Sequence, residues 1–359
     1  MRYAIREPHA GGLESSVWHH VRLLRERGHT VTFCAVEGSD FLDGSPAELR
    51  LPAVAWPAGD AISDVDYPPG YLEFALPRLE AALAWLRDHR DDFDIVDNHC
   101  LNPLPLEWAG RLGIPMVSTL HTPTLPGLVD AHARSARPRS SFLAVSDHTR
   151  QQWQGEGIEA EVVLNGIDTD LWPLGPGGDD LVWFGRIVPE KGPHLAIDAA
   201  RLLGRDIRLA GRVGDVDYAR REVWPRLGPD AAWLGELGQS GLAALVGHSA
   251  CALITPVWHE PFGLVIAEAL SCGTPVASFS TGGVPEVVGD STSARLVAMG
   301  DVAALAAVAA DLMGEFAADP HARTRTRADA VARHSLHDRV AQIELVYRRL
   351  IDQSSGRAA

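Results

Sequence analysis

Short apolar runs alternate with longer segments of helical periodicity along almost the whole chain. Leu181–Phe184 is one such run, and it is typical of a strand buried on both faces of a sheet. Between Tyr71 and Arg90, leucines recur at a spacing of three to four residues, which indicates one buried helix face. Alternating strands and helices form parallel sheets with helices on both faces. The sequence therefore predicts an α/β protein.

The same alternation runs through both halves of the chain. In the first half we expect helices at Glu14–Arg27 and Tyr71–Arg90, a loop from Glu37 to Gly70, and strands at Arg2–Arg6, Thr30–Val36, Phe93–Asp97, Pro115–Leu120, Phe142–Ser146 and Glu161–Leu164. In the second half we expect strands at Leu181–Phe184, Asp206–Ala210, Ala231–Leu234, Cys251–Thr255, Thr274–Phe279 and Ala294–Val297, and late helices at Asp301–Phe316 and Ser335–Ile351. The buried face predicted for the Tyr71–Arg90 helix comprises Leu72, Leu76, Leu79, Leu83 and Leu86.

The length of the chain favours two domains. At 359 residues it exceeds one ordinary core and suits two units of about 150 residues each. A stretch rich in Gly, Pro and Asp, Asp168–Asp180, is the expected linker. We therefore predict two doubly wound, Rossmann-like domains that face each other across a cleft. In such sheets ligands bind beyond the carboxyl ends of the strands, so the loops after strands carry function.

Charge and composition exclude several classes of function. The formal net charge is −15, which disfavours binding to nucleic acid or to an anionic membrane surface. The chain contains no apolar run long enough to span a bilayer, and its first residues lack the apolar core of a signal peptide. Cys34, Cys100, Cys251 and Cys272 show no metal-binding spacing and suit a reducing compartment. We expect a cytoplasmic protein without stable membrane insertion; the oligomeric state is left open.

Lys191 is the only lysine of the chain. It lies in Gly185-Arg186-Ile187-Val188-Pro189-Glu190-Lys191-Gly192, directly after the Leu181–Phe184 strand. A compact ammonium beside a glycine, with an arginine five residues earlier, suits a phosphate group. The alternative is a solvated cation in a loop at the start of a helix.

Two glutamates flank the start of a second helix. Glu260 precedes the apolar segment Phe262-Gly263-Leu264-Val265-Ile266-Ala267, and Glu268 lies two turns inside the helix. Their carboxylates are suited to accept hydrogen bonds from sugar or ribose hydroxyls. Alternatively, Glu260 only pairs with the helix dipole and Glu268 is an ordinary exposed helix residue.

Two Gly-Gly turns also separate a predicted strand from a helix. They are Gly11-Gly12, before Leu13-Glu14, and Gly282-Gly283, before Val284-Pro285. Glycines allow the backbone to approach a ligand closely, and the helix start offers free amides to an anion. Such turns are also common where no ligand binds.

Together these segments resemble the retaining family-4 glycosyltransferases of the GT-B fold. The resemblance rests on G-R-x4-K-G at 185–192, E-P-F-G-L…E at 260–268 and G-G-V-P-E-V-V at 282–288. Looser matches are Gly11-Gly12-Leu13-Glu14, Ser118-Thr119-Leu120-His121, Val145-Ser146 and Leu164-Asn165-Gly166-Ile167-Asp168. The resemblance covers nearly the whole chain, and the motifs occur in the same order as in the family.

The resemblance implies two domains with distinct roles. Residues 1–170, joined by a returning terminal helix at 335–355, would form the acceptor-side domain. Residues 171–334 would form the domain that binds the nucleotide-sugar donor.

The resemblance also implies roles for single residues at the donor. Arg186 and Lys191 would hold the donor diphosphate and stabilise it as the leaving group. Amides at the start of the second helix, together with Gly12 from the other domain, would add to this; they belong to Phe262, Gly263 and Leu264. Glu268 would bind the ribose, and the loop Leu234-Gly235-Glu236-Leu237 would face the base.

Further roles concern the reacting sugar. Glu260 would contact its hydroxyls, and His121 would lie near its primary hydroxyl and anomeric carbon. Both residues therefore join Arg186 and Lys191 in the expected catalytic set. His99 and Trp258 are weaker candidates for contact with the acceptor. For His121 the alternative is a structural, hydrogen-bonded histidine.

No metal is expected. Asp-x-Asp strings at 64–66, 168–170 and 215–217 are expected by chance in an acidic chain and are interpreted as solvated acids. No cofactor is expected either, because the nucleotide-sugar is a co-substrate.

The function predicted is metal-independent transfer of a hexose from a nucleotide diphosphate sugar, most simply UDP-linked, to an acceptor hydroxyl with retention of configuration. The acceptor would be a small molecule or a glycan. The alternatives are a sugar phosphorylase, a nucleotide-sugar epimerase and a non-catalytic nucleotide-sugar binding protein.

Overall fold

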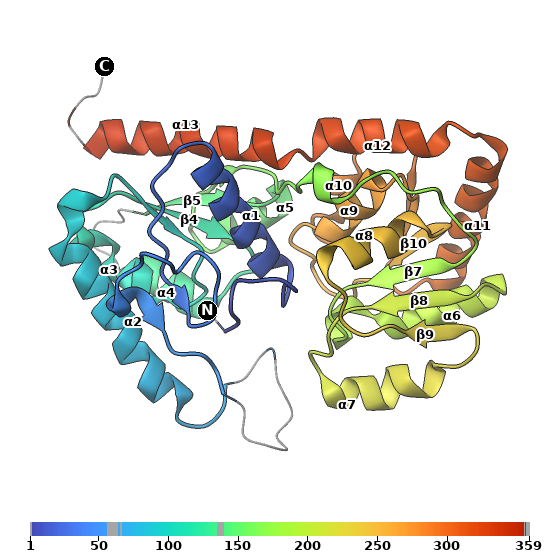
Figure 1. Cartoon of the computed structure of the whole chain (residues 1–359), viewed down its shortest axis with the longest axis horizontal. Coiled ribbons are helices and arrows are strands. Elements are labelled where there is room, and N and C mark those ends of the chain that lie inside the picture. Colours follow the sequence, from blue (N-terminus) through green and yellow to red (C-terminus); the bar gives the residue numbers. More distant parts are fainter. Residues whose placement is uncertain (1, 56–63, 65–66, 135–139, 355, 357–359) are drawn as a thin grey trace. The chain divides into compact units, whose positions relative to one another are not determined.

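A computed structural model describes residues 2–55, 64, 67–134, 140–354 and 356 (Figure 1). The chain divides into two compact units. Unit 1 comprises the described residues of Met1–Pro57, Tyr67–Asn165 and His337–Ala359, and unit 2 comprises Asp64 and Gly166–Leu336. The first unit is thus built from segments at both ends of the chain.

Unit 1 contains two parallel sheets. Strands β3 (Val96–Asn98), β4 (Met116–Leu120), β5 (Ser140–Ala144) and β6 (Glu161–Val162) form one sheet in that order, and β1 (Ala35–Val36) pairs with β2 (Arg50–Leu51). The helices are α1 (Gly12–Glu26), α2 (Tyr71–Asp88), α3 (Leu104–Leu112), α4 (Pro126–Arg134), α5 (Asp147–Gly155) and α13 (Leu336–Ser354).

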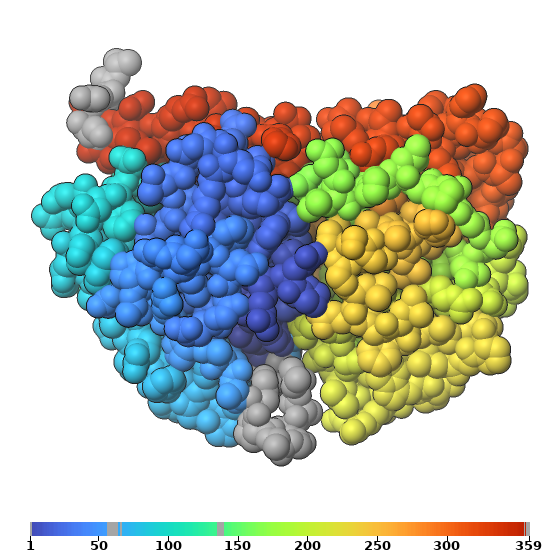
Figure 2. All heavy atoms as spheres, in the orientation of Figure 1, coloured from blue at the N-terminus to red at the C-terminus, as the bar shows by residue number. Residues whose placement is uncertain are grey.

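Helix α13 is part of the structure of unit 1. The buried guanidinium of Arg339 donates hydrogen bonds of 2.8 Å to the carbonyl oxygens of Val163 and Leu164, just after β6. Glu344 pairs with Arg27 at the end of α1. The opposite face of α13 is exposed on the surface of this unit, as the red atoms in Figure 2 show.

Unit 2 is built on one six-stranded parallel sheet with the strand order β12-β11-β10-β7-β8-β9. The strands are β7 (Leu181–Phe184), β8 (Ile207–Ala210), β9 (Ala231–Trp233), β10 (Cys251–Ile254), β11 (Val276–Phe279) and β12 (Ala294–Val297). The helices are α6 (Pro193–Leu203), α7 (Val216–Tyr218), α8 (Gln239–Gly247), α9 (Leu264–Ser271), α10 (Val284–Val288), α11 (Val302–Ala318) and α12 (Ala322–Arg333).

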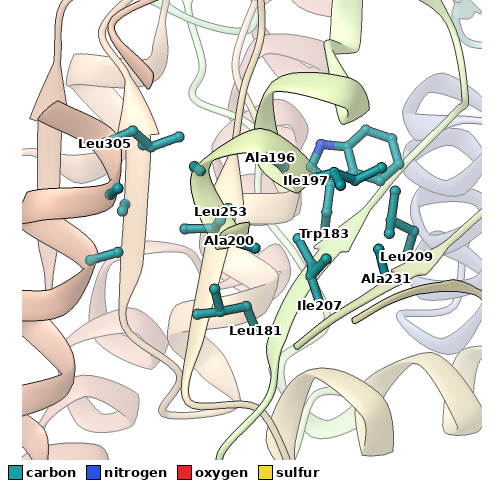
Figure 3. Close-up of a cluster of buried hydrophobic side chains, with 14 of the residues drawn as sticks. Leu181, Trp183, Ala196, Ile197, Ala200, Ile207, Leu209, Ala231, Leu253 and Leu305 are labelled. Carbon is teal, nitrogen blue, oxygen red and sulfur yellow. The ribbon is translucent and has the colours of Figure 1, made fainter. Parts of the chain in front are cut away.

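The core of unit 2 forms where the sheet packs against α6 and α11. Leu181, Trp183, Ile197, Leu253 and Leu305 are fully buried or nearly so, and Figure 3 shows their side chains gathered between these elements. All four residues of β7 are buried, which explains the uninterrupted apolar run of its sequence.

The loop expected at Glu37–Gly70 contains β2, and the strand expected at Thr30–Val36 is reduced to β1. Three other expectations about the fold are wrong. Arg2–Arg6 forms no strand: Ile5 is buried, but its amide donates to Ser39 Oγ and its carbonyl accepts from Asp40. In α2, Leu72 and Leu76 are exposed, and the buried face starts further along the helix.

The third concerns the expected linker at 168–180, which packs against unit 2. Trp172 is buried, and Arg327 donates to its carbonyl oxygen while Arg323 donates to that of Gly175. Within the described residues, no helix combines the length and the apolarity that crossing a membrane requires.

Candidate functional site

The strand order of unit 2 reverses between β7 and β10. From β7 the chain proceeds to β8 and β9 on one side, and from β10 it proceeds to β11 and β12 on the other. In open parallel sheets, ligands bind beyond the carboxyl ends of the strands at such a switch point. The loops that follow these two strands carry the G-R-x4-K-G and E-P-F-G-L segments.

Thr255 joins the two loops. Its hydroxyl lies 3.0 and 2.8 Å from the carbonyl oxygens of Lys191 and Gly192, and it accepts a hydrogen bond of 3.1 Å from Trp183 Nε1. Gly192 has a φ of +58°, and a Cβ there would lie 2.5 Å from the carbonyl oxygen of Thr255. Only glycine fits this close approach without displacing the backbone.

The sole lysine is held by an ion pair across these loops. Lys191 Nζ lies 2.5 Å from Glu260 Oε2, which also accepts a hydrogen bond of 2.8 Å from Trp258 Nε1. The ammonium lies 5.3 Å from the centre of the Trp258 ring. The solvated-cation interpretation of Lys191 is therefore wrong, because its partner Glu260 is almost completely buried.

Two arginines share one carboxylate beside this ion pair. Arg186 follows β7 and Arg212 follows β8, and the register Phe184↔Ala210 aligns the ends of these strands. Arg186 lies 2.5 Å from Asp64 Oδ2, and Arg212 Nη2 lies 2.8 Å from both oxygens. An anion thus already occupies the space between the two guanidinium groups. Sequence reasoning did not identify Arg212, although its position after a strand-ending glycine was a signal.

The Gly-Gly turn after β11 fixes the backbone of Glu260. Gly283 donates from its amide to the Glu260 carbonyl oxygen at 2.7 Å, and Thr281 donates to that of Trp258 at the same distance. Gly282 has a φ of +59°, and a Cβ there would lie 2.1 Å from the Glu260 carbonyl oxygen. This turn supports the site through packing.

Helix α9 begins at Leu264, four residues after Glu260. Its N-cap, Gly263, has a φ of +101° and supplies no side-chain hydrogen bond, so no side chain caps the first turn. Phe262, which directly precedes this N-cap, is buried. The start of α9, with the amide of Leu264, therefore keeps a positive end that favours an anion.

Glu268 lies inside α9 and differs from the other acids of the site. Its carboxylate makes no hydrogen bond or ion pair with any described residue. Burial among apolar neighbours raises the pKa of Glu268 to about 8. The carboxyl group therefore lacks partners for its charged form, and Glu268 is not an ordinary exposed helix residue.

The loop after β9 lies at the same edge of the sheet. The carbonyl oxygen of Gly235 accepts a hydrogen bond of 2.8 Å from the amide of Gly211, and Leu237 is partly exposed two residues further on. The predicted residues of the donor half thus share one edge of one unit.

The other predicted residues belong to unit 1. Gly12 begins α1, whose N-cap Gly11 provides no side chain. His99 follows β3 and His121 follows β4, and the register Asn98↔Ser118 brings their rings together. His99 Nδ1 and His121 Nε2 lie 2.8 Å apart, so one of these nitrogens donates to the other.

His121 is neutral in this environment. Burial, reinforced by the nearby His99 and Arg339, holds the pKa of His121 well below its usual range. Beside it lies a cavity of about 10 Å³, lined by Asn98, Thr119 and Trp153 among others, which has room for about one water molecule. Sequence reasoning did not identify His20 and Asp97, which lie on the other side of His99.

Two of the Asp-x-Asp strings serve as helix caps. Asp168 accepts a hydrogen bond from the Asp170 amide, and Asp215 accepts one from that of Tyr218. Asp168 is buried, so its interpretation as a solvated acid is wrong. The first string lies outside the described residues except for Asp64.

Two family models match the chain. Glycosyltransferase Family 4 matches residues 10–171, and Glycosyl transferases group 1 matches residues 174–328. The D-inositol 3-phosphate glycosyltransferase of Frankia alni is 30% identical over 67% of this chain and 70% of its own. The phosphatidyl-myo-inositol mannosyltransferase of Mycobacterium leprae is 29% identical over 96% of this chain and 95% of its own.

Solved structures share the fold. Anabaena Alr3699/HepE in complex with UDP-glucose superposes with a TM-score of 0.70 at 20% identity, covering 94% of this chain and 96% of that one. A glycosyltransferase from Rickettsia africae gives 0.72 at 15% identity, covering 95% of each chain. The fold is that of the GT-B glycosyltransferases, with two Rossmann-like units. The chain belongs to glycosyltransferase family 4.

Proposed function

We propose that the protein transfers a hexose from a UDP-sugar to an acceptor hydroxyl, with retention of configuration and without a metal ion. The carrying observation is the arrangement of Lys191, Arg186 and the uncapped start of α9 at the switch point of unit 2. These groups suit a diphosphate, and a glycosyltransferase must stabilise this group as it departs.

The departing diphosphate is stabilised by fixed positive charge. Arg186 and Lys191 supply two cations and α9 supplies a helix N-terminus; Arg212 is a third cation within reach of the same carboxylate. Removing one preorganised contact of this kind typically costs about 2.7–4 kcal/mol in the transition state. Three cations supply the charge that a divalent metal provides in other designs, which supports the metal-independent proposal.

While no donor is bound, Asp64 pairs with Arg186 and Arg212, and Glu260 pairs with Lys191. A diphosphate replaces the Asp64 carboxylate between Arg186 and Arg212, and draws Lys191 away from Glu260. Glu260 is then available to accept from the hydroxyls of the donor sugar. Because it also accepts from Trp258 Nε1, its position is kept after Lys191 has moved.

The ribose, the base and the sugar of the donor are assigned to residues by the exposure and chemistry of their side chains. The Glu268 carboxylate, which has no partner among the residues that the structure describes, accepts from the ribose hydroxyls, while Leu237 lies along the base. Gly12 contributes a backbone contact, and His121 contacts the primary hydroxyl of the sugar, as the family implies. His99 and Trp258 are proposed to contact the acceptor.

The choice of UDP is supported by neighbours of the same fold. Anabaena Alr3699/HepE is solved in complex with UDP, with UDP and glucose, and with UDP-glucose. For the acceptor, the relatives named for inositol compounds make a soluble polyol or its phosphate the first choice to test.

The test is transfer from UDP-glucose to an acceptor panel that includes inositol 3-phosphate, measured as UDP release and product mass. Lys191→Ala should lower kcat/KM on the order of 100–1,000-fold, in line with losing one such contact. Arg205→Ala is the control, because this exposed arginine of the same unit makes no side-chain hydrogen bond to any residue that the structure describes. Equal rates in the two variants would rule out the diphosphate assignment.

Metal independence, retention of configuration and the phosphorylase alternative are each tested by a separate measurement. Activity should persist in excess EDTA, and a strict requirement for a divalent cation would overturn the metal-free mechanism. Proton NMR of the first-formed product should show the anomeric configuration of the donor. Formation of sugar phosphate from a glycoside and phosphate, without nucleotide, would instead identify a phosphorylase.

A further inference from the structure

Behind His121, unit 1 contains a largely buried polar cluster in which His20, Asp97 and Tyr347 have no role in the reaction chemistry described above. Asp97 Oδ2 lies 2.9 Å from His20 Nε2, 2.5 Å from the Tyr347 hydroxyl and 3.1 Å from His99 Nε2. His99 in turn contacts His121 through its other ring nitrogen. The contacts thus form a continuous path from Asp97 through His99 to His121.

Three elements far apart in the sequence contribute to this cluster. Asp97 lies in β3, and His99 follows two residues later, so their side chains point to the same face of the sheet. His20 comes from α1 and Tyr347 from α13, and both side chains are buried. Burying this many polar groups is costly unless they are paired, so the cluster calls for an explanation.

We propose that Asp97 is a positioning residue that fixes the tautomer of His121, so that His121 presents an unprotonated Nδ1 to a substrate hydroxyl. This rests on the proposed placement of His121 near the sugar.

The nitrogen atom that carries each proton follows from the chemistry of the neighbouring groups. An ionised carboxylate only accepts, so the His99 nitrogen that faces Asp97, Nε2, carries the proton. In a neutral His99 imidazole, Nδ1 is then an acceptor and takes the hydrogen bond from His121 Nε2–H. The proton of a neutral His121 is thereby placed on Nε2, and Nδ1 keeps its lone pair.

The surrounding hydrogen-bond donors keep Asp97 ionised. The neighbouring His99 and His20 hold the pKa of Asp97 well below its usual range despite its burial. Burial lowers the pKa of His20, and burial next to Asp97 raises that of Tyr347 well above its usual range. Both therefore donate to Asp97 as neutral groups. The buried guanidinium of Arg339 balances the one negative charge.

Asp97 and His99 lie within hydrogen-bonding distance, but the orientation of the two side chains does not form a hydrogen bond. The two atoms lie 3.1 Å apart, yet His99 Nε2 and Asp97 Oδ1 have no hydrogen-bond partner among the described residues. A turn of the imidazole toward the carboxylate satisfies both groups.

A metal ion is the competing explanation. Ligand atoms of His20, Asp97 and His99 all lie within 4.8 Å of one another. However, a dication would add two positive charges to a buried cluster in which Asp97 is already balanced by Arg339. Uncompensated charge in such a site is strongly unfavourable, so the tautomer assignment is favoured.

The first experiment uses the natural protein labelled with 15N-histidine. Long-range 1H–15N correlation spectra should show His121 as the Nε2–H tautomer at pH 7. A dominant Nδ1–H tautomer overturns the proposal. This readout does not depend on activity, so it stands even if the proposed function fails. Metal analysis of the same sample should find less than about 0.1 zinc or iron per chain; near-stoichiometric metal overturns the proposal in favour of a metal site.

The second experiment uses Asp97→Asn, whose amide keeps the size of the side chain but removes the obligatory acceptor. The His121 tautomer should become mixed, and kcat should fall about 10–100-fold with little change in the KM for donor, by analogy with other partners that orient a histidine. Tyr347→Phe leaves the carboxylate in place and should keep both the tautomer and most of the activity.

A double-mutant cycle tests whether the effect of Asp97 on activity depends on His121. If Asp97 acts through His121, Asp97→Asn should add little to the loss caused by His121→Ala. Independent, additive losses overturn the positioning role. Full activity of His121→Ala would instead remove His121 from the proposed function while leaving the tautomer measurement unaffected.

Discussion

At the scale of single residues, the most informative acids of the site are two glutamates that differ in their hydrogen bonding. Glu268 has no hydrogen-bond partner in the described part of the chain, whereas Glu260 has both Lys191 and Trp258. The first carboxyl group therefore prefers its neutral form, and the second is prepared to exchange one charged partner for another. Both features arise from burial of polar groups at the edge of one sheet.

We predict that binding of UDP releases a proton from Glu268. Below pH 8 the free carboxyl group is mostly protonated, and ribose hydroxyls stabilise its ionised form. Affinity should therefore rise with pH between about 5 and 8, by at most about tenfold per unit. Calorimetry at pH 6.5 in buffers of different ionisation enthalpy measures the proton directly, and Glu268→Gln should abolish its release. Binding without proton exchange in the natural protein would contradict the assignment to the ribose.

The same group makes the stability of the free protein depend on pH. Because its folded pKa lies above the unfolded value of 4.5, its favourable contribution is complete below that value and is lost as the pH rises through about 8. Glu268→Gln should therefore flatten the decline of thermal stability between pH 5 and pH 8. An unchanged slope would show that the carboxyl group is ionised already.

At the scale of elements, the loops after β7, β10 and β11 act as one unit. Thr255 joins the first two loops, and Gly283 joins the third to Glu260. The conformation of these loops depends on glycines that approach another backbone closely. A substitution outside the ligand contacts is therefore expected to affect the site.

Gly282→Ala tests this coupling with a matched control. Gly282 and Gly204 have nearly equal φ values, +59° and +62°, but a Cβ at 282 meets the Glu260 carbonyl oxygen, whereas one at 204 meets nothing within 4 Å. The control should lose about 1–2 kcal/mol through backbone strain alone. Gly282→Ala should lose more and should also weaken UDP binding. Urea unfolding and calorimetry measure both quantities, and equal losses with equal UDP affinity would refute the coupling.

Prediction from sequence worked best where local pattern and burial coincide. The bounds of β7 were predicted to the residue, because buried parallel strands form continuous apolar runs. Those of β12 were also predicted to the residue, although this strand contains Arg295 and only its first residue is buried. The prediction of Arg2–Arg6 failed because Ile5 is buried without joining a sheet. Arg212 was missed because its proximity to Arg186 depends on the register of β7 and β8, which the local sequence does not specify.

At the scale of the whole molecule, the first unit depends on the last helix of the chain. Arg339 supplies donors to carbonyl oxygens after β6, and Tyr347 and Glu344 contact residues from β3 and α1. A fragment that ends near residue 170 would leave these groups without partners. The two ends of the chain therefore have to meet before the first unit is complete.

We predict that residues 1–170 expressed alone do not unfold cooperatively, and that they bind hydrophobic dyes. Residues 166–336 should show a cooperative transition, because their six-stranded sheet is formed within one segment. Fusing residues 336–354 to the first fragment through a flexible linker should restore its transition. A cooperative transition in the unfused fragment would contradict the structural role of α13.

The single lysine has a consequence for chemical labelling. Apart from the α-amino group, the chain offers only one primary amine to reagents that acylate amines, and it lies in the Lys191–Glu260 pair. A mass tag on this amine would therefore report the occupancy of one defined position in intact protein. Protection of that amine by a nucleotide would allow ligands to be ranked by mass spectrometry without an acceptor.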